Sequence, residues 1–258
     1  MEKPSPEANP ISLTTSQVII RIVAIISSVE FLIMLALKTL PINMGTFSEA
    51  TLDLILLASF STPLLYILVI KPFVIARDNS LDHISYLAYT DPLTQLPNRR
   101  LLSMHLEKCL ASAVRHKVRG AVLLIDLDGF KTINDIHGHD AGDKVLIETA
   151  KRLLANTRTE DVAGRLGGDE FVILIQHLNS DEAIARKTAQ QIAEKLVNAI
   201  KKPISFEGTS LNIGASIGIR ILEFKNQDSK SILKEADSAM YHAKRTGAGR
   251  AVFFEENL

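Results

Sequence analysis

The chain has 258 residues, and its 29 lysines and arginines balance 29 aspartates and glutamates, so the formal net charge is zero. This length has room for one ordinary domain and a smaller segment, and the neutral balance gives no indication of binding to nucleic acid. Hydrophobic residues make up 47% of the sequence, which points to membrane-spanning segments. The single cysteine, Cys109, excludes an internal disulfide and is consistent with a reducing cytosol.

The N-terminal quarter of the chain predicts a disordered lead and two transmembrane helices. Residues 1–17 contain three prolines and no apolar period, so we expect them to be disordered and cytoplasmic. Residues 18–37 and 54–70 are almost wholly apolar, and the first run has the ~20 residues that a spanning helix needs. It lacks the basic leader, short length and cleavage site of a signal peptide, which favours a helical hairpin. Lysines and arginines lie near the outer edges of the hairpin, so both termini are expected in the cytoplasm.

Two residues interrupt the apolar runs. Glu30 lies deep in the first run, where an ionisable side chain points to a function such as contact with a partner helix; the alternative is a carboxyl that is protonated or shielded within the hairpin. Pro63 predicts a kink in the second run. Residues 71–90 become polar and amphipathic, which predicts a connecting helix too short to indicate a coiled coil.

Residues 91–258 predict one soluble α/β domain. Its first segment, residues 91–100, indicates a proline-bounded turn followed by a helix that Asn98 caps. Residues 121–125 are continuously apolar, as in a strand buried on both faces, and the strand ends at Asp126, where a carboxylate is well placed to bind a cation.

The remaining elements follow from apolar spacing. Residues 129–143 are polar and punctuated by glycine, so we expect a loop, and residues 141–157 form an amphipathic pattern. Further helices are predicted over residues 181–200 and 231–245, and a strand over residues 211–222.

A hairpin with an acidic tip is predicted in the middle of the domain. Short strands over residues 161–163 and 171–175 flank the glycines Gly167 and Gly168. The adjacent carboxylates of Asp169 and Glu170 repel each other unless a cation lies beside them, so the tip is a candidate divalent-metal site. A solvated acidic turn is the alternative.

The run Gly167-Gly168-Asp169-Glu170-Phe171, together with the entry segment Asp91-Pro92-Leu93-Thr94-Gln95-Leu96-Pro97-Asn98-Arg99-Arg100, resembles the GGDEF family of bacterial diguanylate cyclases. The resemblance covers residues 91 to about 254. It implies an α/β domain of the α+β ferredoxin-like or palm type, as in nucleotidyl cyclases, preceded here by a two-helix transmembrane hairpin.

The implied reaction condenses two GTP into cyclic di-GMP and two pyrophosphates, in a homodimer whose domains each hold one GTP. By the resemblance, Mg²⁺ or Mn²⁺ is bound by Asp126, the backbone carbonyl of Leu127 and Asp169, and Lys131 stabilises phosphate charge. Asp169 or Glu170 accepts the proton, and the sequence does not choose between them. The positions that match substrate-binding residues are Asn134, His139, Asp143, Lys244 and Arg250. His137 and His139 also have a zinc-like spacing, but no further ligand completes a tetrahedral set nearby.

Two further positions bear on regulation and affinity. Arg158 and Asp161 have the Arg-x-x-Asp spacing of the family's inhibitory site for cyclic di-GMP; a surface ion pair is the alternative. Ala248 stands where the family commonly has arginine, with Arg250 or Arg245 as the candidates to replace it, which puts phosphate affinity in doubt.

The expected whole is a product-inhibited cyclase in the inner membrane of a bacterium, multi-pass, with its catalytic domain in the cytoplasm. The runner-up is a catalytically weak domain that serves as a cyclic di-GMP receptor or membrane signalling scaffold, and Ala248 is the residue that favours it. GTP, cyclic di-GMP, a second copy and the membrane are the expected partners, and nucleic acid is not.

Overall fold

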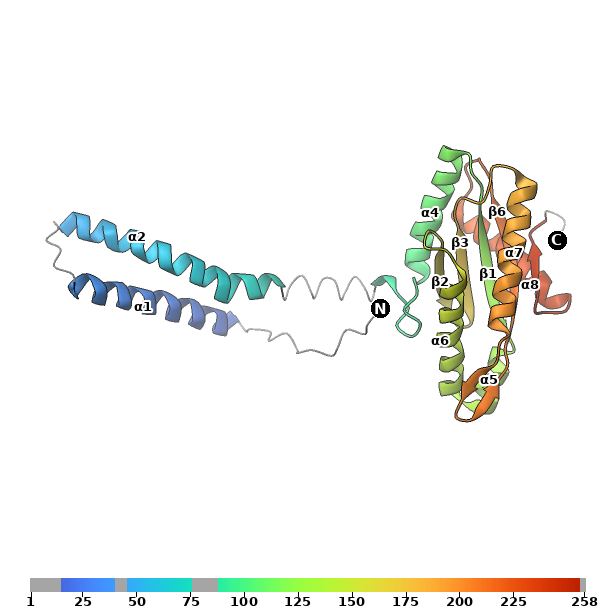
Figure 1. Cartoon of the computed structure of the whole chain (residues 1–258), viewed down its shortest axis with the longest axis horizontal. Coiled ribbons are helices and arrows are strands. Elements are labelled where there is room, and N and C mark those ends of the chain that lie inside the picture. The colour runs from blue at the N-terminus through green and yellow to red at the C-terminus, as the bar shows by residue number, and fades with distance from the viewer. Residues whose placement is uncertain (1–14, 40–45, 76–87, 256–258) are drawn as a thin grey trace. The chain divides into compact units, whose positions relative to one another are not determined.

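The computed structural model describes residues 15–39, 46–75 and 88–255, and its contacts divide the chain into two compact units, Met1–Ser85 and Tyr86–Leu258 (Figure 1). Most of the predicted disordered lead, and residues 76–87 of the predicted connecting helix, lie outside the described residues. The last three residues of that lead are helical.

The first unit is a pair of helices. The helix α1 spans Thr15–Thr39 and packs against α2, Thr46–Leu65, which continues through a π-helical segment, η1, Tyr66–Ile70. The stretches Ser16–Thr39 and Phe47–Ile75 have mean hydropathies of 2.5 and 2.0, and only 11% of each is buried, unlike the core helix of a soluble protein. The helices are therefore candidates for membrane spans.

The second apolar helix begins earlier than predicted and is irregular near its end. Its first residue is Thr46, whereas the apolar run starts at residue 54. Pro63 lies inside α2, and η1 begins three residues after it. A proline has no amide hydrogen to donate to the preceding turn, and such a gap is commonly accommodated by a local change of helix type.

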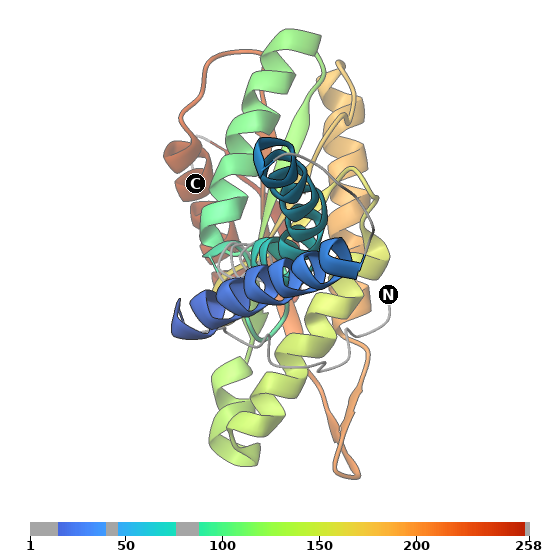
Figure 2. The same cartoon turned by 90° about the vertical axis from the view of Figure 1, so that its left-hand side faces the viewer.

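The second unit is a mixed sheet with helices on its faces, which confirms the predicted α/β fold class (Figures 1 and 2). The sheet has the order β2-β3-β1-β6-β7, and all neighbours are antiparallel except β6 and β7. In chain order its elements are α4 (Arg99–His116), β1 (Gly120–Asp128), α5 (Phe130–His137), α6 (His139–Asn156), β2 (Val162–Gly167), β3 (Glu170–Ile175), α7 (Glu182–Ile200), β4 (Ile204–Phe206), β5 (Thr209–Leu211), β6 (Gly214–Leu222), α8 (Ser229–Arg245) and β7 (Ala251–Phe253).

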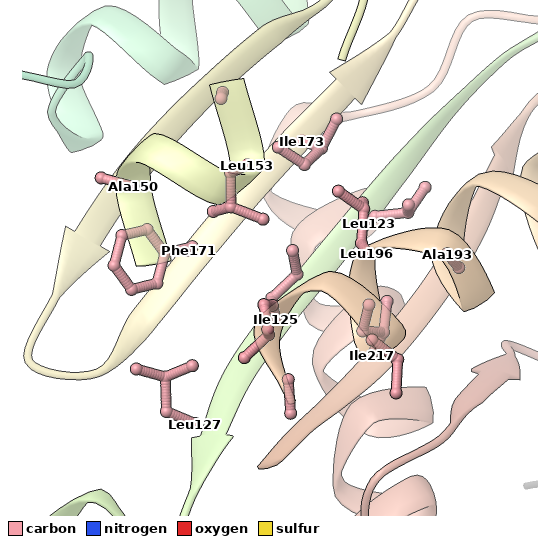
Figure 3. Packing of buried hydrophobic residues seen from close by; sticks show 14 of the residues in the cluster. Leu123, Ile125, Leu127, Ala150, Leu153, Phe171, Ile173, Ala193, Leu196 and Ile217 are labelled. Carbon is pink, nitrogen blue, oxygen red and sulfur yellow. The ribbon is translucent and has the colours of Figure 1, made fainter. Parts of the chain in front are cut away.

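The central strand β1 is buried on both faces because its side chains alternate between two cores. Leu123, Ile125 and Leu127 point to the side where α6 and α7 contribute Leu153 and Leu196, as Figure 3 shows. On the other face, Val122 and Leu124 join side chains of α4 and α8. Continuous apolar sequence was therefore the right signal for this strand.

The predicted loop over residues 129–143 is wrong, because most of it is helical. Gly129 and Gly138 have positive φ angles of 81° and 83°, and each begins a helix, α5 or α6. Ile133 of α5 is buried against the core. Glycine punctuation thus marks the ends of two short helices instead of an irregular loop.

Strand boundaries also differ from the prediction. Residues 204–211 hold a separate two-stranded sheet, β4 and β5, which the sequence did not indicate. Each strand has three residues, too few for an alternating pattern to be recognised. This hairpin and α5 extend at the same end of the domain in both views (Figures 1 and 2).

Candidate active site

The C-terminal end of the central strand β1 lies beside the acidic turn between β2 and β3. Asp126 is in register with Glu170 of β3 on one side and with Ser216 of β6 on the other. The turn between β2 and β3 depends on Gly167 and Gly168, whose φ angles of 145° and 53° are unfavourable for residues with a side chain. Phe171, the last residue of the motif, is fully buried opposite Ile125. The motif therefore combines a buried anchor with an exposed tip.

The Asp126 carboxylate is buried near the end of β1. Asp126 is 8% exposed, and its Oδ1 lies 2.6 Å from the Nζ of Lys244 at the end of α8. Apart from this ion pair, Oδ1 accepts no hydrogen bond from the described residues. Burial raises the pKa of Asp126 above its usual value; Lys244 opposes the rise, and the charges of Asp169 and Glu170 add to it. An ionised Asp126 thus needs a cation beside it.

The donor set suits a hard divalent cation, because Mg²⁺ and Mn²⁺ prefer carboxylate and carbonyl oxygens. Asp126 supplies a buried oxygen, Leu127 follows it on β1, and Asp169 and Glu170 are half-buried at the turn. Within residues 15–39, 46–75 and 88–255, no group of three or more acidic, histidine or cysteine side chains is already gathered for a metal. The assignment of metal ligands stays a prediction.

The guanine-binding candidates lie at the junction of α5 and α6. Asn134 is half-buried on α5, while His139 and Asp143 are exposed on the first turns of α6. A Cβ atom added to Gly142 would lie 1.9 Å from Asn134 Oδ1, so the missing side chain lets Asn134 approach α6. Lys131 is exposed on α5.

The segment after α8 carries the departure from the family pattern. Ala248 has a φ angle of 45°, and the amide of the next residue, Gly249, donates to Asp128 Oδ2 over 2.9 Å. Arg250 is exposed, and its guanidinium lies over Gly247, where an added Cβ would be 2.8 Å from Nη2. Arg245 lies over the Tyr241 ring at 5.8 Å from its centroid. A role for Arg250 or Arg245 toward phosphate stays a prediction.

The Arg-x-x-Asp pair closes the turn between α6 and β2. Asp161 accepts the amide of Arg158 over 3.3 Å and the amide of Gln176 over 3.1 Å. Burial raises the pKa of Asp161, which the two amides partly offset. The Arg158 guanidinium is exposed, and its ion-pair partner is Glu160 at 3.9 Å. The carboxylate of Asp161 is thus held in place by two backbone amides, while the guanidinium of Arg158 extends into solvent.

One arginine that the sequence analysis overlooked binds two motifs together. Arg165 Nε and Nη2 donate to the carbonyl of Gly168 over 3.0 and 2.7 Å, and Nη1 donates to Asp91 Oδ1 over 3.0 Å. Asp91 also accepts the amide and hydroxyl of Thr94. Burial raises the pKa of Asp91, but these hydrogen bonds outweigh it and lower the pKa overall. The available signal was an arginine just before the glycines and an aspartate that opens the domain.

Comparison with known proteins decides the family. The sequence profile of "Diguanylate cyclase, GGDEF domain" matches residues 88–250. The chain belongs to the GGDEF family. Its GGDEF domain resembles that of MucR from Pseudomonas aeruginosa, a bifunctional diguanylate cyclase and cyclic di-GMP phosphodiesterase, with 46% identity over 172 residues. This alignment covers 67% of the chain but 24% of MucR, so the chain spans about a quarter of that relative.

Solved GGDEF structures agree with the fold. The isolated GGDEF domain of TpbB from Pseudomonas aeruginosa is 38% identical, with a TM-score of 0.61 over 66% of this chain and 96% of that one. The GGDEF domain of DgcB from Caulobacter crescentus, solved in complex with cyclic di-GMP, is 26% identical, with a TM-score of 0.57 over 66% of this chain and 97% of that one. All the predicted site residues of this chain lie inside the GGDEF match.

Proposed function

We propose that the chain is a diguanylate cyclase, which condenses two GTP into cyclic di-GMP and two pyrophosphates. The observation that carries the proposal is the buried Asp126 carboxylate, which is in register with Glu170 of the signature turn. Among the described residues, its Oδ1 has no hydrogen bond beyond the Lys244 ion pair. A carboxylate pair of this kind at a strand end suits a metal-dependent nucleotidyl transfer.

Each half-reaction joins the 3′-oxygen of one GTP to the α-phosphorus of the other and releases pyrophosphate. Asp126, the carbonyl of Leu127 and Asp169 would hold Mg²⁺ or Mn²⁺, which offsets phosphate charge and lowers the pKa of the attacking hydroxyl. Asp169 or Glu170 takes the proton of that hydroxyl. Lys131, Lys244 and Arg250 stabilise the charge of the phosphates.

Base recognition falls to the α5–α6 junction. Asp143 accepts from guanine N1–H and N2–H, and Asn134 both donates and accepts, which discriminates against adenine. His139 completes this set. Support comes from Gly142, whose lack of a side chain leaves room for Asn134 at the start of α6.

The reaction needs two GGDEF domains, because one domain supplies one half-site. The enzyme is therefore a homodimer in its active form, with residues 91–258 as the cyclase domain. In this proposal α1 and α2 are two membrane spans in the inner membrane of a bacterium, with residues 1–17 and the cyclase domain in the cytoplasm. The apolar stretches Ser16–Thr39 and Phe47–Ile75 support this arrangement.

Product inhibition through Arg158 and Asp161 is the regulatory part of the proposal. The exposed guanidinium and the fixed carboxylate suit the phosphate and guanine edge of cyclic di-GMP. In an assay with rising cyclic di-GMP, Arg158→Ala should leave the initial rate near that of the parent and remove the inhibition. Inhibition that survives in the variant would contradict this assignment.

The test of the main proposal uses the full chain in lipid nanodiscs, with GTP and Mg²⁺ or Mn²⁺, and mass spectrometry of the product. Asp169→Asn should abolish cyclic di-GMP formation, while Asp237→Asn, an exposed acid on α8, should not. No product from the parent would overturn the cyclase. Retained binding of cyclic di-GMP in that event, dependent on Arg158, would favour the receptor that Ala248 suggests.

A further inference from the structure

Glu30 occupies the middle of the first apolar helix and faces away from its neighbour. It is the fifteenth residue of the 24-residue apolar stretch Ser16–Thr39. Its side chain is exposed, and among the residues that the structure describes it accepts no hydrogen bond and pairs with no cation. A lone carboxyl at this depth is unfavourable in a membrane helix, so a partner is expected.

The contact with α2 is made by a different face of α1. Val29 and Ile33 are each 7% exposed and lie toward α2. Glu30 belongs to a neighbouring stripe, in which Val23 and Met34 are 57% and 64% exposed and Ser27 is also exposed. Residues 23, 27, 30 and 34 are spaced by four, three and four, the spacing of a seam between two packed helices. The hairpin therefore leaves this stripe uncovered, along with other exposed faces of α1, and Glu30 is the residue that distinguishes it.

The side chains of this stripe indicate what kind of helix could pack against it. A protonated carboxyl both donates and accepts, so two such groups satisfy each other across a two-fold axis. The two cations of the same helix, Lys38 and Arg21, are eight and nine residues away, which is about 12 and 14 Å along the axis and beyond the reach of Glu30. Ser27 adds a small hydroxyl next to the carboxyl, and small or polar residues are typical of helix contacts in membranes.

We propose that Val23, Ser27, Glu30 and Met34 form a homodimer surface in the membrane, where Glu30 hydrogen-bonds to Glu30 of a second copy. The inference rests on the proposed membrane insertion and gives the proposed cyclase its second half-site. Pairing of two hairpins raises the effective concentration of one cyclase domain near the other without any new contact between the domains themselves. The occupant is thus another copy of this chain, in parallel orientation.

Two adjacent serines provide a matched test. Ser27 and Ser28 are both exposed, but they project about 100° apart on the helix, and only Ser27 lies on the stripe of Glu30. In the full chain carrying Cys109→Ala, reconstituted in liposomes, Ser27→Cys should form disulfide-linked dimers on mild oxidation. Ser28→Cys should form at most about a fifth as many, because its sulfur points away from the proposed seam.

The role of the carboxyl is tested in the Ser27→Cys background. Glu30→Gln should keep the cross-link, since an amide also donates and accepts, whereas Glu30→Met, of similar length, should reduce it about fivefold or more. Equal cross-linking of the two serine positions, or full cross-linking with Glu30→Met, would overturn the proposed surface.

The readout is independent of catalysis. Cross-linking that follows the predicted pattern in a chain that makes no cyclic di-GMP would sink the cyclase and leave the dimer surface standing. Product formation without stripe-specific cross-linking would do the reverse. Failure of the chain to enter liposomes, measured by alkaline extraction, would overturn the membrane insertion on which the surface depends.

Discussion

The guanidinium of Arg165 donates to the carboxylate of Asp91, 74 positions earlier in the chain, and in the same fork to the carbonyl of Gly168. Both side chains are largely buried, with 11% and 18% exposed. The first turn of the cyclase domain and the signature turn are thereby held by one side chain, so the position of the acidic tip depends on the entry segment.

Replacing Arg165 with methionine should lower both stability and activity. The loss of charged hydrogen bonds at a mostly buried site should reduce the free energy of unfolding by about 2 kcal/mol. A displaced turn should lower kcat about tenfold or more, because the proposed metal ligand Asp169 would be misplaced. Urea unfolding and initial-rate assays check this, with Arg99→Met, exposed on α4, as the control. A variant with parental kcat would show that the β2–β3 turn keeps its position without the hydrogen bonds of Arg165.

Lys244 should oppose metal binding before substrate arrives, because its ammonium lies 2.6 Å from Asp126 Oδ1. In Lys244→Met, Mn²⁺ should bind the nucleotide-free protein about fivefold more tightly. The effect is modest because the Lys244 side chain is 37% exposed, and solvent screens its charge. The KM for GTP should rise in the same variant, since the proposed contact of Lys244 with phosphate would be lost. Electron paramagnetic resonance of free Mn²⁺ measures the first effect, and Lys234→Met on the same helix is the control.

An unchanged Mn²⁺ affinity in Lys244→Met would contradict the competition between the ammonium and the metal. A lower affinity would mean that the lysine helps the metal to bind. Either result leaves the KM measurement to decide on the phosphate contact alone.

Gly142→Ala should weaken the affinity for GTP without lowering the stability of the domain. Alanine in a helix interior is favoured over glycine by about 1 kcal/mol, so the variant should be at least as stable as the parent. Its methyl group would lie 1.9 Å from Asn134 Oδ1 and must displace that side chain. The KM for GTP should therefore rise about tenfold with little change in kcat. Thermal unfolding and kinetics check both halves, and an unchanged KM would argue against a role for Asn134 in guanine binding.

Cys109 should be nearly inert in the folded protein. Burial, and next the charge of Asp161, raise the pKa of its thiol from 9.0 to about 11. At pH 8 the thiolate fraction falls about 100-fold, so labelling by an aromatic disulfide should be at least that much slower than in urea. Because the unfolded thiol ionises near pH 9 and the folded one near pH 11, this group's contribution to stability is lost as the pH rises between those values.

The matched control for the thiol is Ser180→Cys in a Cys109→Ala background, which places a thiol in an exposed loop. That thiol should react at the rate of a free cysteine. Comparable rates for the two thiols would mean that the α4 core opens easily.

The sequence was sufficient wherever a local pattern carried the information. Continuous apolar residues identified β1, and Asn98 caps α4 as predicted. The family motif identified the acidic turn. Short elements such as α5 and β4 were missed or misassigned, because their few residues do not repeat an apolar spacing long enough to be recognised.

The contacts that shape the site could not be predicted, because they join distant parts of the chain. Lys244 follows Asp126 by more than a hundred residues, and only the packing of α8 beside β1 brings them together. The same holds for Arg165, which lies two residues before the signature run, and Asp91, which opens the entry segment. The sequence motifs identified candidate site residues, but their contacts with distant residues follow only from the packing of the domain.

The π-helical segment Tyr66–Ile70 changes the direction in which the side chains of the next helical residues, Lys71 to Ile75, project. A π turn takes up one more residue than an α turn, so later side chains project about 100° from where an uninterrupted α-helix would place them. Lys71 and the helical residues up to Ile75 therefore leave the apolar segment with a rotational phase of their own. Conversion of that one turn to α geometry would rotate Lys71 to Ile75 by about 100° around the helix axis and shift them along it by no more than a few ångströms.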